Sequence, residues 1–176
     1  MTKTELLMPA YRFGSLGEVT PDVLREMGAK AVGLDIDNVI APDGTLKYAP
    51  GVKEWVKSIT DAGIPVTLIS NGTIFRVKTV SKYLGGIPFV HLAKKPRPGG
   101  LIKAAKRMNV KITELAMLGD QLFSDIKAAN RCGAIAVRID PLPGKSLYPH
   151  YYEWKAKREK PYLDAFEKRR RQADNK

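Results

Sequence analysis

Short apolar runs alternate with segments of helical periodicity from about Thr20 to about Asp140. Thr20-Pro21 is typical of a helix start and Gly28 of a helix end, and the apolar run from Ala31 to Asp35 that follows is typical of a buried strand. This order of helix and strand recurs along the chain. The pattern predicts an α/β fold with a Rossmann-like, mainly parallel sheet and helices on both of its faces.

After this first unit, further elements can be assigned from the same signals. We expect helices at 50–62, 73–84, 100–108 and 124–132, and strands at 66–69, 88–92, 115–118 and 134–139. Asp43-Gly44 lies between the strands expected at 31–35 and 66–69, and it indicates a hairpin turn. We call the small segment around this turn the flap.

The character of the chain changes after Asp140. The stretch from Tyr148 to Trp154 is aromatic, and the residues from Lys155 to Arg171 are mostly basic. Because Pro161 interrupts this segment, a single long amphipathic helix is not expected. We therefore predict a domain at 1–147 and a basic, aromatic C-terminal extension at 148–176.

Composition narrows the function classes. In 176 residues, 30 Lys and Arg stand against 18 Asp and Glu, a net charge of +12 that favours anionic partners. The single Cys132 cannot form an internal disulfide, and there is neither a signal-peptide pattern nor an apolar run of about 18 residues. We expect a cytoplasmic protein without a transmembrane segment, and peripheral contact with a membrane stays open.

Polar side chains follow four of the predicted strands, at the point where each strand ends. They are Asp35 and Asp37, Ser70-Asn71, Lys95 and Asp120. Each alone is ordinary turn chemistry, since Asp, Ser and Asn favour turns and a carboxylate such as Asp125 suits a helix start. Because the carboxyl ends of parallel strands meet at one sheet edge, where ligands bind, the ordered set favours a functional site.

Crowded carboxylates repel one another, and a Mg²⁺ ion that is bound by carboxylates, water and substrate phosphate would relieve this repulsion. Asp35 would then be a nucleophile that carries a phosphoryl group, and Asp37 would protonate the leaving oxygen and later activate water. Ser70, Asn71 and Lys95 would bind the substrate phosphate, and Asp120 would complete the metal site.

The ordered motifs resemble those of phosphatases of the haloacid dehalogenase superfamily, subclass III-A, in the YqeG-like group related to mitochondrial phosphatidylglycerophosphate phosphatase. Asp35-Ile36-Asp37-Asn38-Val39 matches the first motif, Ser70-Asn71 the second, Lys95 the third and Gly119-Asp120 through Asp125 the fourth. The resemblance covers roughly residues 5–140.

The resemblance implies Asp35 as nucleophile, Asp37 as general acid and base, and Mg²⁺ held by Asp35, the Asp37 carbonyl and Asp120. Asp125 would orient metal-bound water or Lys95. Close relatives in this family usually have threonine where this chain has Val39, and threonine or a similar residue where it has Ser124. The short intervals between the motifs leave no room for a cap domain, so the site should be open.

Three functions follow as alternatives. An open site beside a basic, aromatic extension suits a phosphatidyl-type lipid phosphate at an anionic membrane surface, with phosphatidylglycerophosphate as the example. The same chemistry could act on a soluble sugar or nucleotide phosphate. The third is a nucleic-acid or ribosome-associated binding protein on the same scaffold, which we do not favour.

Overall fold

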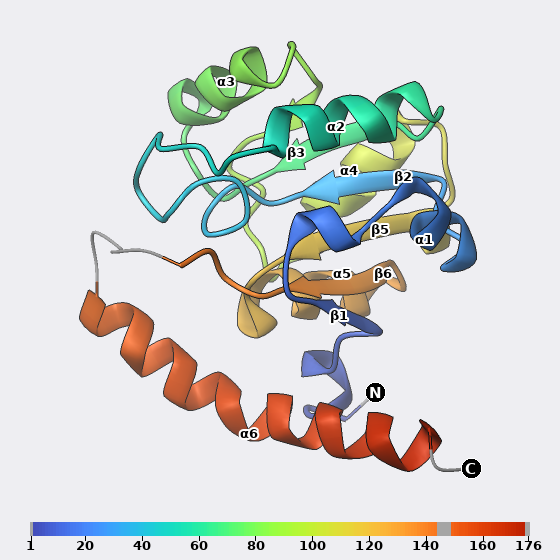
Figure 1. Cartoon of the computed structure of the whole chain (residues 1–176), viewed down its shortest axis with the longest axis vertical. Coiled ribbons are helices and arrows are strands. Elements are labelled where there is room, and N and C mark those ends of the chain that lie inside the picture. The colour runs from blue at the N-terminus through green and yellow to red at the C-terminus, as the bar shows by residue number, and fades with distance from the viewer. Residues whose placement is uncertain (1, 144–148, 175–176) are drawn as a thin grey trace.

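The computed structural model describes residues 2–143 and 149–174, and its centre is a six-stranded, fully parallel sheet (Figure 1). The strand order is β1-β6-β5-β2-β3-β4. The strands are β1 (Tyr11–Phe13), β2 (Ala31–Leu34), β3 (Val66–Ile69), β4 (Phe89–Val90), β5 (Leu115–Gly119) and β6 (Ile135–Ile139).

Helices cover both faces of the sheet, as the alternation of apolar runs predicts. They are α1 (Pro21–Glu26), α2 (Val52–Asp61), α3 (Ile74–Tyr83), α4 (Gly99–Arg107) and α5 (Lys127–Cys132). The last helix, α6 (Pro149–Asp174), lies beside the edge strand β1 (Figure 1). Shorter helical turns lie at Glu5–Leu7, Leu16–Glu18, Ile112–Glu114 and Leu122–Ile126.

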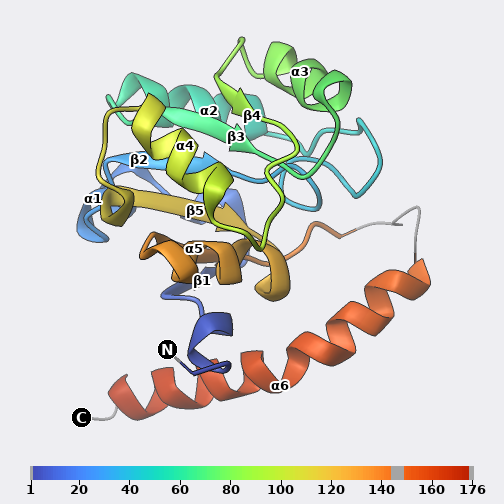
Figure 2. The same ribbon diagram turned by 180° about the vertical axis from the view of Figure 1, so that it is seen from behind.

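Two apolar cores lie on opposite faces of the sheet, because successive side chains of a strand point to opposite sides. Val32 and Leu34 of β2 pack in one core with residues of α1, α2 and α3, whereas Ala31 packs in the other with residues of α4 and α5. Figure 2 shows α4 and α5 from this second side. Strands buried on both faces explain the continuous apolar runs in the sequence.

The chain leaves β2 toward β3 on one side, while β5 pairs with β2 on the other side. The connections that leave β2 and β5 thus run to opposite sides of this strand pair. This arrangement opens a crevice at the carboxyl ends of the two strands, where α/β proteins bind ligands. Asp35 follows β2 and Asp120 follows β5, so both residues lie at this crevice. Between β2 and β4 the chain forms only a loop, α2, β3 and α3, without an inserted cap domain.

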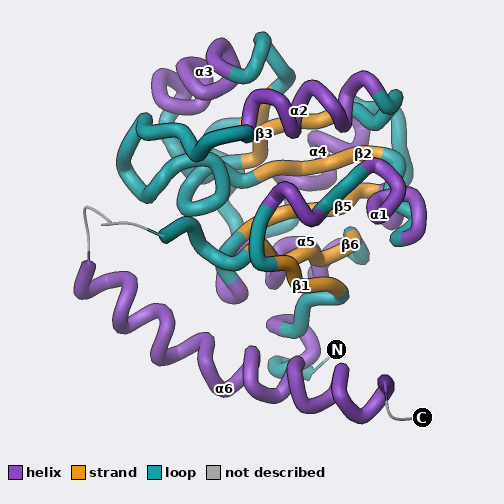
Figure 3. Tube along the Cα trace, viewed as in Figure 1, coloured by secondary structure: helices purple, strands orange, loops and turns teal. Residues whose placement is uncertain are grey.

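One local prediction was wrong, and one strand was missed. Asp43-Gly44 does form a turn, in which the Thr45 N–H donates to the Pro42 carbonyl over 3.0 Å, but no strands of the described chain flank it and the flap is a loop (Figure 3). The edge strand β1 was not predicted, because three half-exposed residues, Tyr11 to Phe13, carry too short a pattern.

The prediction that Pro161 would prevent a long helix was also wrong. The described part of the extension forms one helix, α6, of 26 residues with Pro161 inside it. An internal proline costs about 3 kcal/mol, and contacts with the domain on both sides of Pro161 offset this cost. Glu159 accepts a hydrogen bond from the Leu122 N–H, and Glu167 pairs with Arg12. Tyr148 and residues 175–176 lie outside the described residues.

Candidate active site

A buried lysine joins two of the carboxylates that the sequence places at strand ends. The Lys95 Nζ lies 2.7 Å from Asp35 Oδ1, 2.7 Å from Asp125 Oδ1 and 2.7 Å from the Ile69 carbonyl oxygen. All three side chains are almost fully buried. The neighbouring carboxylates raise the Lys95 pKa, although burial opposes them, so the ammonium stays charged. Lys94, the preceding residue, is exposed.

Asp125 reaches this lysine because a glycine lies opposite it. A Cβ atom at position 119 would lie 2.4 Å from Asp125 Cγ, so Gly119 leaves the space that the carboxylate fills. The Gln121 N–H donates to Asp125 Oδ2 over 3.0 Å and fixes the second oxygen. Asp125 therefore holds Lys95 rather than facing solvent.

The two oxygens of Asp120 have different surroundings. Oδ2 accepts from Asn38 Nδ2 over 3.1 Å and from Lys155 Nζ over 2.9 Å. Oδ1 is buried and has no hydrogen-bond partner within the described part of the chain. An unpaired buried carboxylate oxygen is costly, so a ligand that contacts it would be stabilising.

The acidic cluster fits a hard divalent cation. Asp35, Asp120 and Asp125 each offer one carboxylate oxygen, and these oxygens lie within 4.8 Å of one another. Burial, followed by repulsion from Asp125, raises the pKa of Asp35 to about 8. Burial likewise raises the pKa of Asp120 to about 6, although Lys155 counteracts it. A cation with oxygen ligands, such as Mg²⁺, would favour the charged carboxylates.

Asp37 lies apart from this cluster, at the flap. Its Oδ1 accepts from Arg76 Nη2 over 2.6 Å and from the Gly44 N–H over 3.4 Å. Burial raises the pKa of Asp37, and the charge of Arg76 partly offsets this effect. A half-buried carboxyl with a raised pKa is suited to proton transfer.

Ser70 and Asn71 follow β3 and shape the loop around Lys95. The Asn71 side chain both accepts from the Lys95 N–H (2.8 Å) and donates to the Lys95 carbonyl (3.0 Å). The Ser70 Oγ accepts from the Gly72 N–H over 3.0 Å. The Asn71 amide is thus committed to positioning Lys95, and a contact with phosphate from Asn71 would come from its backbone.

Three residues at the site were not predicted: Asn38, Arg76 and Lys155. Asn38 has a positive φ of 57°, a conformation that asparagine tolerates, and this tolerance is the only local signal that it gives. Arg76 and Lys155 are two of 30 basic residues, and only the fold brings them to Asp37 and Asp120. Val39 of the first motif is 1% exposed and packs in the apolar core.

Several exposed apolar side chains lie in segments that follow the carboxyl ends of strands or near the start of α6, and we call them the apolar rim. The rim comprises Leu46, Ile74, Phe75, Leu92, Tyr151 and Trp154. Phe75 is 82% exposed. Its neighbour Arg76 contacts both Asp37 and the Thr45 carbonyl, which places Phe75 beside the flap. Trp154 precedes Lys155 on α6.

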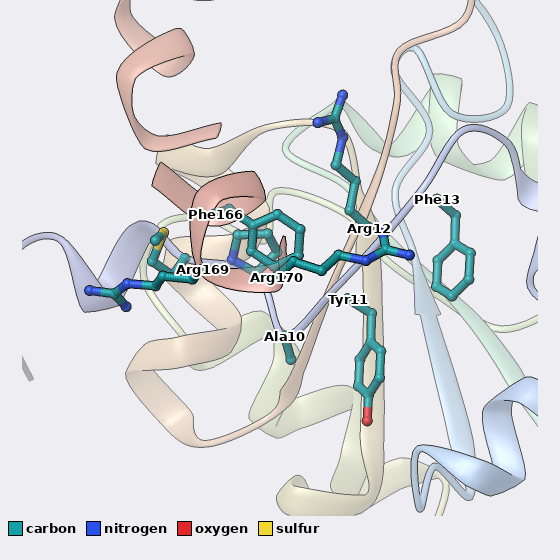
Figure 4. Close-up of a pocket in the computed structure, with 9 residues that line it drawn as sticks. Ala10, Tyr11, Arg12, Phe13, Phe166, Arg169 and Arg170 are labelled. Carbon is teal, nitrogen blue, oxygen red and sulfur yellow. The ribbon is translucent and has the colours of Figure 1, made fainter. Parts of the chain in front are cut away.

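A groove of about 500 Å³ lies elsewhere, between β1 and the end of α6 (Figure 4). Arg12, Arg169, Arg170, Tyr11 and Phe166 are among the residues that line it, and none of its described lining residues carries a carboxylate. It therefore offers no carboxylate ligand for a metal, and we place the candidate active site at the strand ends.

Comparison with known proteins agrees with this geometry. The model of the haloacid dehalogenase-like hydrolase family matches residues 11–133. A relative from Bacillus subtilis, named probable phosphatase YqeG, is 33% identical over 138 residues, which is 78% of this chain and 80% of that protein. Phosphatidylglycerophosphate phosphatase 1 of Arabidopsis thaliana is 27% identical, over 78% of this chain and 42% of its own length.

A solved structure shows the same fold. The cobalt-bound deoxy-D-mannose-octulosonate 8-phosphate phosphatase from Haemophilus influenzae aligns with a TM-score of 0.52 and 20% identity. The alignment covers 76% of this chain and 90% of that chain.

Proposed function

Since this chain belongs to the haloacid dehalogenase-like hydrolases and is a phosphatase of phosphoric monoesters, we propose that it acts on a membrane-lipid phosphate through an aspartyl-phosphate at Asp35. The observation that supports the lipid substrate is the apolar rim, whose exposed residues follow strand ends or begin α6. The observation that supports Asp35 as nucleophile is its burial at the strand end, with Lys95 on one of its oxygens.

In the first step a carboxylate oxygen of Asp35 attacks phosphorus, and the bond from phosphorus to the leaving oxygen breaks. Asp37 gives its proton to that oxygen, so an alcohol leaves. In the second step the Asp37 carboxylate takes a proton from water, whose oxygen attacks phosphorus. The bond to Asp35 then breaks, and inorganic phosphate leaves with the nucleophile regenerated.

The surrounding residues orient the nucleophile and stabilise negative charge on the phosphoryl group during both steps. Lys95 orients Asp35 and lowers its pKa against the effect of burial. We assign binding of the phosphoryl oxygens to Ser70 and the backbone after β3. A divalent cation at Asp35, the Asp37 carbonyl and Asp120 would, when bound, neutralise negative charge on the transferred phosphoryl group.

The rim and the charge of the chain together favour a lipid rather than a soluble ester. Apolar and aromatic side chains settle at a membrane interface, and each nearby Lys or Arg adds about 1 kcal/mol of attraction to anionic lipid. Lys47 adjoins Leu46, and Lys94 lies two residues after Leu92; both lysines are exposed. None of the described helices is long and apolar enough to cross a membrane, so the proposed contact is with the membrane surface.

The test is phosphate release from phosphatidylglycerophosphate in mixed micelles, compared with a panel of water-soluble phosphomonoesters. We expect faster release from the lipid, dependent on Mg²⁺ and lost in Asp35→Asn. Release from soluble esters alone would overturn the lipid substrate and keep the chemistry. No release from any substrate would overturn the proposed reaction and turn attention to the basic surface.

A further inference from the structure

Helix α6 contributes a buried lysine to the candidate active site. Lys155 is 7% exposed, and its Nζ lies 2.9 Å from Asp120 Oδ2. The family match ends at residue 133, so this lysine comes from a part of the chain outside the matched region. In Figures 1 and 2, α6 starts at the side of the sheet toward which the strand arrows point.

A second buried side chain on the same helix face fixes this lysine. Glu159, one turn after Lys155, is 2% exposed and accepts from the Leu122 N–H over 2.8 Å. Its other oxygen lies 3.4 Å from an Arg138 nitrogen. Residues four apart lie on one helix face, so the pair contacts the chain just after β5 and inside β6. Lys155 is thereby held in place against Asp120.

The contact with Lys155 involves only one of the two carboxylate oxygens of Asp120. Oδ2 is occupied by Lys155 and Asn38, whereas the buried Oδ1 has no partner among the described residues. A group that hydrogen-bonds the second oxygen of a metal-binding carboxylate orients that carboxylate. Loss of such a group typically lowers metal affinity 10- to 100-fold. The geometry thus presents one oxygen of Asp120 for a cation.

We propose that Lys155 is a positioning residue that orients Asp120 for metal binding, so that docking of α6 and binding of the divalent cation strengthen each other. This inference rests on the metal-dependent phosphatase proposed above. Binding is measured without substrate, so it does not depend on which ester the enzyme hydrolyses.

The charge of Lys155 and its orienting contact predict opposite effects on Mg²⁺ binding when the residue is replaced. The variant Lys155→Met therefore distinguishes between them. Removing a positive charge near a cation site would by itself tighten cation binding. If Lys155 orients Asp120, Lys155→Met instead weakens Mg²⁺ binding about 10-fold or more by titration calorimetry. Lys160→Met is the matched control, because Lys160 lies on the same helix, is exposed and pairs with Asp164. Its Mg²⁺ affinity should equal that of the native chain.

Turnover measurements add a second readout. We expect Lys155→Met to need more Mg²⁺ for half-maximal rate while recovering most of its kcat at saturating Mg²⁺. Unchanged or tighter Mg²⁺ binding in Lys155→Met would overturn the proposal.

The native chain provides a test that does not depend on the variant folding. Coupling between two sites is reciprocal, so Mg²⁺ should slow amide hydrogen exchange in α6 at residues 150–160. Exchange there that is unchanged by bound Mg²⁺ would also overturn the proposal. A chain that passes both tests but releases no phosphate from lipid would disprove only the proposed substrate.

Discussion

Arg76 Nη2 lies 2.6 Å from Asp37 Oδ1 and 3.2 Å from the Thr45 carbonyl, so one guanidinium joins α3, the flap and the proposed acid and base. The contact fixes Asp37 outside the carboxylate cluster around Asp35. The two aspartates of the first motif therefore have different surroundings. Asp35 belongs to the buried network with Lys95, and Asp37 contacts the flap.

This separation predicts the effect of Asp37→Asn. An amide cannot transfer the proton, so kcat should fall by about 10²-fold or more. Because the Asp37 side chain is not in the acidic cluster, Mg²⁺ affinity should stay within about twofold of native. The measurement is steady-state phosphate release with calorimetric Mg²⁺ titration as the control. A near-native rate would remove Asp37 from the mechanism.

Lys95 balances two buried carboxylates, and its removal should destabilise the fold. We expect Lys95→Met to lower the free energy of unfolding by about 3–5 kcal/mol, since Asp35 and Asp125 would lose their buried partner. The exposed Lys94 provides the matched control, and Lys94→Met should change stability by less than about 0.5 kcal/mol. Urea denaturation without metal measures both. Equal stability of the two variants would contradict the buried network.

The raised pKa values predict how stability depends on pH. In the folded, metal-free chain the pKa of Asp35 is about 8 and that of Asp120 about 6, against a usual value of 3.8. Between about pH 4 and 8 the folded state therefore holds protons that the unfolded state has lost, and stability falls as pH rises. Mg²⁺ should offset this loss, because it competes with protons for the same carboxylates.

The rise in Tm on adding Mg²⁺ should accordingly be larger at about pH 8 than at about pH 5.5. At 100 times the Kd, bound ligand adds about 2.7 kcal/mol, which corresponds to roughly 5–10 °C for a chain of this size. Thermal melts with and without Mg²⁺ measure it, and Asp120→Asn should lose most of the rise. An equal rise at both pH values would argue against competition with protons.

The apolar rim predicts a variant that affects only membrane-held substrate. Phe75→Ser should raise the KM for micellar phosphatidylglycerophosphate about tenfold, because part of the 1.5–3 kcal/mol for burying such a side chain is lost. Hydrolysis of soluble esters should not change. Ile102 is 49% exposed on α4, away from the site, and Ile102→Ser is the control. The same KM change in both variants would show that the rim has no special role.

The sequence by itself determined the elements whose signals are local. The buried strands β2, β3 and β5 are continuous apolar runs, and Thr20 marks the start of α1, where its Oγ accepts from the Val23 N–H. The polar residues that follow these runs lie at one sheet edge because parallel strands share their direction. The order of apolar runs and polar residues alone is therefore enough to place Asp35, Lys95 and Asp120 near one another, whereas Asp125 was added only by the resemblance to the family.

Only the tertiary structure decided which partners hold these side chains. Lys155 lies 35 positions from Asp120 in sequence, on a helix that continues through Pro161, and nothing local distinguishes it from the other basic residues of α6. Local propensity disfavours that helix at the proline, but contacts of Glu159 and Glu167 with the domain outweigh it. Helix and strand signals depend on residues that are close in sequence, whereas buried ion pairs depend on how distant segments pack. For this reason the sequence predicts where the carboxylates lie, and only the fold determines how they are oriented.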